Sequence, residues 1–262
     1  MVDNVKYMEL ITIREVSEYT YQFRDLMYEA IMDEYTELSY STTKFINAIL
    51  MGAITLNESF LELMKKGYNL AATPMIRMQL DNCLTTYASI IYPNKEKFYS
   101  HYIKGEPLNH LKIDGKPLTS RFLKDRLMQK DSFCDAVGRL FDDACKYIHP
   151  SNYQYGEVIT EGDDCLYIGD KTVEMITDEY ELEVAAAECG ISPEWCDDLF
   201  WDMQYADDVL LFLAKEVVQS IKDAELVGEC RPFKVTLDSE APYERNVKIY
   251  SGIRGMGFDF KG

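Results

Sequence analysis

The stretch from Ser39 to Asn69, SYSTTKFINAILMGAITLNESFLELMKKGYN, decides the fold class of this chain. Its apolar residues recur every three or four positions, which is the period of an amphipathic α-helix. These residues are Phe45, Ile46, Ile49, Leu50, Ala53, Ile54 and Leu61. Ser41, Thr42 and Thr43 are candidate N-caps, and Gly67 is a typical stop signal. The stretch predicts one long helix that must bury an apolar face against others.

The same period continues on both sides of this stretch. It runs from Ile11 to about Glu37 and again from about Leu70 to Ile91. Short joins between long helices favour antiparallel neighbours, so residues 8–92 are predicted to form three long antiparallel helices. Pro74 is expected in the first turn of the third helix, where a missing N–H costs little.

The second half of the chain has a different pattern. Helical spacing resumes after Thr119 or Ser120 as cap, ends at Pro150, and returns from a Ser192 cap to about Leu226. Between these runs, β-branched residues and glycines predict either a strand pair around EGDD or an irregular insertion, and an alternating, glycine-rich pattern follows residue 227.

The predicted fold class is therefore mainly α: an antiparallel helical bundle with a small β-like insertion (about 153–176) and a β-like C-terminal tail. We expect one helical-bundle domain over residues 1–262, an acidic insertion at 153–190, and a tail or hairpin at 227–262.

Charge is distributed unevenly over the chain, whose net charge is −18. The segment Glu157–Asp208 holds seventeen acids and one base, whereas Lys95–Lys130 holds nine bases and four acids. We expect the acidic segment to dock a protein partner by electrostatic steering, through Asp163, Asp164, Asp197 and Asp198. Nucleic acid would bind only locally, through Lys95–Lys130, and a solvated surface is the alternative for the acidic segment.

The expected cellular location follows from features that the sequence lacks. Apolar runs do not approach the length of about 20 residues that spans a bilayer, and the start has no signal-peptide pattern. The seven cysteines have no CxxC pair, so we expect reduced thiols, a cytoplasmic location and no membrane contact. Homo-oligomerisation is left open.

Nucleotide-binding and hydrolase motifs are absent from the sequence, which predicts no cofactor. The three histidines are His101, His110 and His149, at spacings of 9 and 39 that place no two rings on one helix face. We therefore expect no metal site.

One polar pair stands out within an apolar helix. Arg77 and Asp81 are four residues apart in PMIRMQLDNCL, so they can pair on one helix face, and both are expected to be mostly buried. Polar residues in apolar contexts later in the chain extend this set. The catalytic candidates are Arg77, Asp81 and His149, and the ligand-binding candidates are Arg77, Tyr102, Lys146, His149 and Ser151. Either Arg77–Asp81 is a structural ion pair and His149 a helix cap, or they form an anion site.

The order of these motifs carries a family resemblance. The chain has an Arg-centred helix (RMQLDNCLTTYASIIY), then HYIKG, DGKPLTSRFLKDRL and a helix ending in YIHPS. Over about residues 70–152 this resembles bacterial HEPN-like helical proteins of the abortive-infection or phage-defence type. The resemblance implies an all-α bundle that draws Arg77, Asp81 and His149 together.

Two functions are compatible with this pattern. The first is a non-enzymatic interaction or regulatory protein with an acidic docking face. The second is a HEPN-like ribonuclease or phosphodiesterase that uses Arg77 and His149. No arginine here has a histidine at the spacing of that family's catalytic motif, since His149 follows Arg139 by ten residues. The sequence therefore favours the interaction protein.

Overall fold

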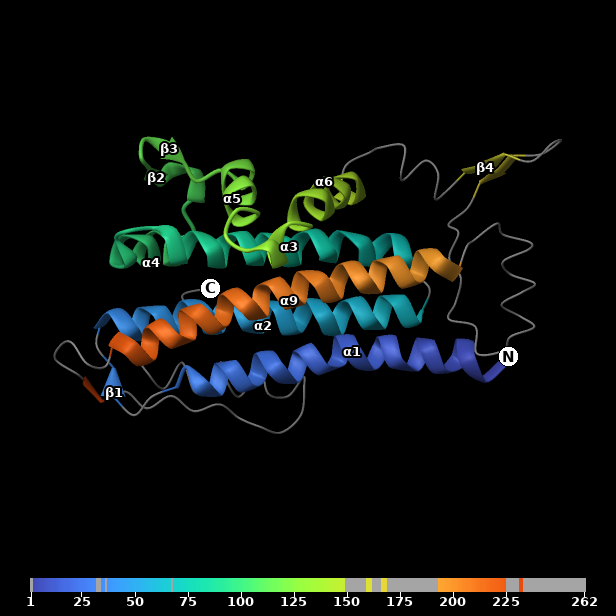
Figure 1. Ribbon diagram of the computed structural model, residues 1–262, viewed down its shortest axis with the longest axis horizontal. Coiled ribbons are helices and arrows are strands. Elements are labelled where there is room, and N and C mark those ends of the chain that lie inside the picture. Colours follow the sequence, from blue (N-terminus) through green and yellow to red (C-terminus); the bar gives the residue numbers. More distant parts are fainter. Residues whose placement is uncertain are drawn as a thin grey trace, which may run out of the picture.

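Four long helices lie along the long axis of the molecule in the computed structural model (Figure 1). The structure describes residues 2–31, 34–35, 37–66, 68–148, 159–161, 166–168, 193–224 and 231–232. The long helices are α1 (Val2–Glu29), α2 (Glu37–Lys65), α3 (Asn69–Ile91) and α9 (Pro193–Ala224). The first three alternate in direction, which confirms the predicted antiparallel arrangement, and α9 packs against all three, antiparallel to α2.

A second, shorter layer covers the outer side of α3. After α4 at the end of α3, two 3₁₀ turns, a two-stranded hairpin and two helices follow, and α5 and α6 pack on α3 (Figure 1). These elements are α4 (Lys95–Ile103), η1 (Leu108–His110), β2 (Lys112–Ile113), β3 (Lys116–Pro117), α5 (Ser120–Leu127), η2 (Ser132–Cys134) and α6 (Val137–Ile148).

The remaining strands form two short antiparallel pairs. β4 (Ile159–Glu161) pairs with β5 (Leu166–Ile168), which confirms the strand pair predicted around EGDD. β1 (Glu34–Tyr35) lies between α1 and α2 and pairs with β6 (Arg231–Pro232), a contact that the helical period of this region did not predict. The rest of the predicted insertion and tail lies outside the described residues.

The bundle core is built from the apolar stripe of α2. Phe45, Ile46, Leu50 and Phe60 are buried, and the Phe60 ring meets that of Phe200 on α9 edge-on at 5.5 Å. Burial of such side chains contributes about 1.5–3 kcal/mol each and is the main force holding the layers together. Among the helices that the structure describes, none combines the length and apolarity needed to cross a bilayer.

The beginning of α2 corrects the predicted caps. The helix starts at Glu37, so Thr42 and Thr43 lie inside it rather than at its N-terminus. Thr42 donates to the carbonyl of Leu38 at 2.8 Å, and Thr43 donates across to the carbonyl of Ala30, the residue after α1, at 3.2 Å. Hydroxyls that find carbonyl acceptors in this way are tolerated within a helix, so a hydroxyl run alone does not mark its start.

Pro74 also lies deeper in its helix than predicted. Because α3 begins at Asn69, the proline is inside the helix and leaves the carbonyl of Leu70 without its usual amide donor. The Thr73 hydroxyl donates to that carbonyl at 3.1 Å instead.

Two other predicted helix starts agree with the structure. Thr119 is confirmed as the cap of α5, with its side chain accepting from the Phe122 amide. The helix α9 begins at Pro193 as predicted, and Ser192 lies outside the described residues.

Candidate functional site

Arg77 and Asp81 form the predicted ion pair on α3. Arg77 Nη1 lies next to Asp81 Oδ1, and the arginine side chain is only 10% exposed. Asp81 is half exposed (50%), so the expectation that both members are mostly buried is wrong for the acid. Arg77 faces the second layer, whereas Asp81 faces solvent and stays hydrated.

The Arg77 guanidinium is stacked on an aromatic ring from the second layer. Its central carbon lies 3.7 Å from the centroid of the Phe141 ring on α6, and Lys124 approaches the same ring at 5.5 Å. Arg77 Nε and Nη1 are buried and have no hydrogen-bond partner, so the contact with Asp81 is ionic rather than a well-aligned hydrogen bond. These contacts hold α6 on α3, a structural role for Arg77.

The other predicted ligand-binding residues are distributed over the fold. Tyr102 lies on α4, which follows the C-terminal end of α3 (Figure 1). Its ring lies edge-on to that of Phe45, with the centroids 4.8 Å apart. Lys146 is exposed on α6 and pairs with Asp143 at 2.6 Å, a contact that raises the pKa of the lysine. His149 and Ser151 lie outside the described residues. The predicted meeting of Arg77 and His149 therefore stays a prediction.

The structure describes two of the four predicted docking residues, and only by their backbone. Asp163 and Asp164 are not among the described residues, and Asp197 and Asp198 belong to α9 by their backbone alone. Within the basic segment, Lys124 pairs with Asp142 at 2.6 Å and Lys130 with Glu216 at 2.7 Å. These acids offset part of the positive charge for which local nucleic-acid binding was expected.

A buried polar network that sequence reasoning missed lies between α2, α3 and α9. Asp207 is fully buried and accepts from Asn57 Nδ2 at 2.8 Å and from Gln79 Nε2 at 2.5 Å. Asn57 and Gln79 are also fully buried, and Asn82 donates to Gln79 at 3.0 Å. The sequence of α2 did contain an indication of this network, because Asn57 occupies a position of the apolar stripe between Ile54 and Phe60.

Burial controls the protonation of this network. Desolvation raises the pKa of Asp207 well above its usual value, and the hydrogen bonds from Gln79 and Asn57 offset only part of this rise. Asn57 Oδ1 is buried without a partner. Both Asp207 carboxyl oxygens accept from amide N–H groups, while burial disfavours the charged form of the acid.

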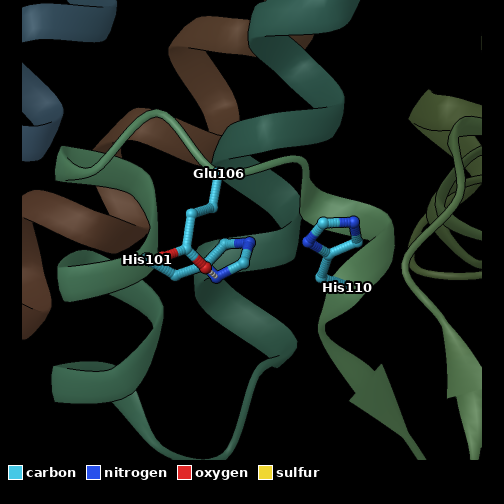
Figure 2. A group of neighbouring side chains, drawn as sticks. All are labelled: His101, Glu106 and His110. Atoms are coloured by element: carbon cyan, nitrogen blue, oxygen red, sulfur yellow. Dashed lines mark ion pairs between the residues drawn. The ribbon is translucent and has the colours of Figure 1, made fainter.

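His101, Glu106 and His110 form a cluster at the end of α4 (Figure 2). His101 Nδ1 lies 2.8 Å from a Glu106 carboxylate oxygen, and the two imidazole centroids are 6.1 Å apart. One possible ligand atom from each residue lies within 4.8 Å of the other two. The two histidines do not share a helix face, as their spacing of nine predicts, because His101 lies on α4 and His110 on η1; the turn between these elements brings the rings together.

The turn after α4 explains how the cluster forms. Gly105 adopts a φ of +68°, a left-handed conformation that ends the helix and brings Glu106 back beside His101. The Pro107 carbonyl then accepts from His101 Nε2 at 2.8 Å and from the backbone N–H of His110 at 3.0 Å. One carbonyl thus fixes the His101 ring and the backbone of His110 together.

An aromatic patch is exposed where α9 meets η2; we define it as Phe133, Trp201, Tyr205 and Phe212. Trp201, Tyr205 and Phe212 share one face of α9, and the Phe133 centroid lies 6.0 Å from those of Tyr205 and Phe212. Trp201 is 63% exposed, Phe133 42% and Phe212 36%. The Tyr205 hydroxyl donates to the Phe133 carbonyl at 2.8 Å, which holds the patch together.

Comparison of the chain with protein-family models, with curated proteins and with solved structures found no match. The HEPN-like resemblance of residues 70–152 therefore stays a prediction, and function must be argued from the sites described above.

Proposed function

We propose that this chain is a non-enzymatic interaction protein that binds a basic, apolar segment of a partner protein. The observation that carries the proposal is the aromatic patch. Trp201 exposes 63% of its surface to solvent and lies one helical turn before Tyr205, and the Phe133 ring lies beside those of Tyr205 and Phe212. Exposed aromatic residues supply much of the binding energy in protein interfaces, and contiguous ones mark interaction sites.

Charge identifies the class of partner. Besides the buried Asp207, the helix that carries most of the patch, α9, contains seven acids and two bases, within a chain of net charge −18. These acids would attract lysines or arginines that surround the apolar face of a partner. The apolar side chains of the partner would then insert between the acids. This assigns to α9 the acidic docking role expected for Glu157–Asp208, with aromatic residues as anchors.

The ribonuclease alternative has weaker support among the described residues. Arg77 is stacked on Phe141 and paired with Asp81, so its guanidinium is engaged within the fold. A phosphate-binding arginine would instead direct its fork towards a ligand.

The test uses a cationic amphipathic helical peptide of lysine and leucine as probe, with its glutamate counterpart as the charge control. We expect the full chain to bind the lysine peptide only, with an affinity that falls as salt rises. Trp201→Ser and Phe212→Ser should each weaken binding at least about tenfold, as removal of an interface anchor does. Tyr21→Ser is the matched control, because Tyr21 is also 63% exposed but lies on α1.

Two results would overturn the proposal. Equal binding by wild type, Trp201→Ser and Tyr21→Ser would show that the patch is not the docking site. Sedimentation velocity that shows a wild-type dimer, converted to monomer by Trp201→Ser, would show that a second copy of the chain covers the patch instead.

A further inference from the structure

The pair formed by His101 and Glu106 poses a problem of proton placement. The Pro107 carbonyl can only accept, so His101 Nε2 must carry the proton that it donates over 2.8 Å. In the neutral ring Nδ1 then has a lone pair, and it faces a carboxylate oxygen only 2.8 Å away. Two lone pairs at this distance repel, so a proton or a metal ion must lie between them.

The position of His110 favours a metal ion, rather than a shared proton, between His101 and Glu106. A proton shared by His101 and Glu106 needs no third group, yet His110 lies beside the pair with one ring nitrogen pointing towards the His101 ring (Figure 2). The shared Pro107 carbonyl holds it in this place. The cluster thus supplies two imidazole nitrogens and one carboxylate, a donor set typical of zinc sites that keep a fourth position for water.

We propose that His101, Glu106 and His110 form a Zn²⁺ site, with His101 Nδ1, a Glu106 carboxylate oxygen and a His110 ring nitrogen as ligands. The Nε2 proton of His101, donated to the Pro107 carbonyl, supports this assignment. Metal-bound histidines commonly direct their second nitrogen to a carbonyl, which fixes the tautomer and leaves the other nitrogen free for the ion.

The distances allow the site to close by side-chain rotation. Ligands of one tetrahedral zinc ion lie about 3.4 Å apart, given metal–ligand bonds of about 2.0–2.1 Å. The Nδ1–carboxylate distance of 2.8 Å is slightly shorter than this, and one possible ligand atom from each residue lies within 4.8 Å of the other two. Glu106 is 47% exposed and His110 is also exposed, so both can move around the buried His101 ring.

The first test is a zinc titration of the full chain. The protein is reduced, stripped with a chelator and titrated with ZnCl₂ in competition with a chromophoric chelator. We expect Glu106→Gln and His110→Ala each to weaken zinc binding at least about 100-fold, because even loss of an outer-shell partner costs 10–100-fold. Both side chains are exposed, so both variants should fold.

Matched controls separate the site from other binding. Glu96→Gln removes an exposed carboxylate from the first turn of the same α4, and Asn109→Ala alters the residue beside His110. Both should bind zinc as wild type does. Zinc held by any of the seven cysteines would respond to none of these four substitutions, and an affinity unchanged by Glu106→Gln and His110→Ala would overturn the proposal.

A second test reads the His101 ring directly. With three histidines in the chain, imidazole ¹⁵N spectra can be assigned with single-histidine variants. Zinc should shift His101 Nδ1 to a metal-coordinated position, keep Nε2 protonated and shift His110 in the same titration step. A His101 ring that stays doubly protonated in excess zinc would show that a proton bridges the pair, and would overturn the proposed metal site.

Discussion

The guanidinium carbon of Arg77 lies 3.7 Å from the centroid of the Phe141 ring, so a stacked cation and ring connect α3 to α6. Because Arg77 is almost buried while its acidic partner Asp81 is half exposed, the two members of the ion pair contribute differently to stability.

Arg77→Ala should lower the free energy of unfolding by about 2–4 kcal/mol, because it removes both the stack on Phe141 and buried packing. Asp81→Asn should cost only about 0–1 kcal/mol, because solvent screens an exposed partner and the amide can still accept. Urea denaturation of the two variants measures the difference. Equal losses would contradict a structural role centred on the stack.

Asp207→Asn should stabilise the protein increasingly as pH rises. Burial raises the folded-state pKa of Asp207 well above its ordinary value of 3.8, so the folded state holds a proton that the unfolded state releases. Wild-type stability is therefore lost as pH rises from the unfolded pKa through the folded one, by up to about 1.4 kcal/mol per pH unit. The asparagine has no such titration.

Chemical denaturation of wild type and Asp207→Asn at pH 5 and pH 8 checks this sign. The stability difference should favour the variant more at the higher pH. A difference that is the same at both values would mean that Asp207 is ionised in the folded protein throughout this range.

Gly105→Ala should cost about 1–2 kcal/mol, because alanine is strained at a φ of +68°. Gly115 is a matched control: its φ is +76°, and at both positions a Cβ would meet nothing within 4 Å. Thermal unfolding should show similar losses for the two variants. The turn at Gly105 places Glu106 beside His101, so only Gly105→Ala should also weaken zinc binding; equal zinc affinities would contradict this link.

Gly52→Ala should stabilise the protein by about 0.5–1 kcal/mol through helix propensity. The new Cβ would meet only Asn82 Nδ2, at 4.0 Å. At Gly138 a Cβ would come within 2.5 Å of Met128 Sδ, so Met128 would have to move and Gly138→Ala should gain less. Equilibrium denaturation compares them, and a larger gain at Gly138 would be the contrary result.

The bundle was predictable because its helices carry a clear apolar period. In α2 the positions predicted to be apolar and inward-facing, from Phe45 to Leu61, are buried. The beginning of the helix was less predictable, since Thr42 and Thr43 resemble caps in sequence and are distinguished only by the carbonyls that they reach.

The polar sites were less predictable for different reasons. His101 and His110 meet through a left-handed glycine and a shared carbonyl, and neither leaves a periodic signal. Asp207 is one of five aspartates in the first half of α9, and its burial depends on Asn57 and Gln79 from distant helices. An aspartate among so many acids is predicted to lie on a solvated face, and only the packing of the helices shows that Asp207 is buried.

The late position of α9 in the chain has a consequence for biosynthesis. About a hundred residues separate the end of α3 at Ile91 from the start of α9 at Pro193. At about 5–20 residues per second, a ribosome needs about 5–20 s to cover this distance. During that interval Asn57 and Gln79 have been synthesised without Asp207, and the apolar surface of α1–α3 that α9 covers has no partner from that helix.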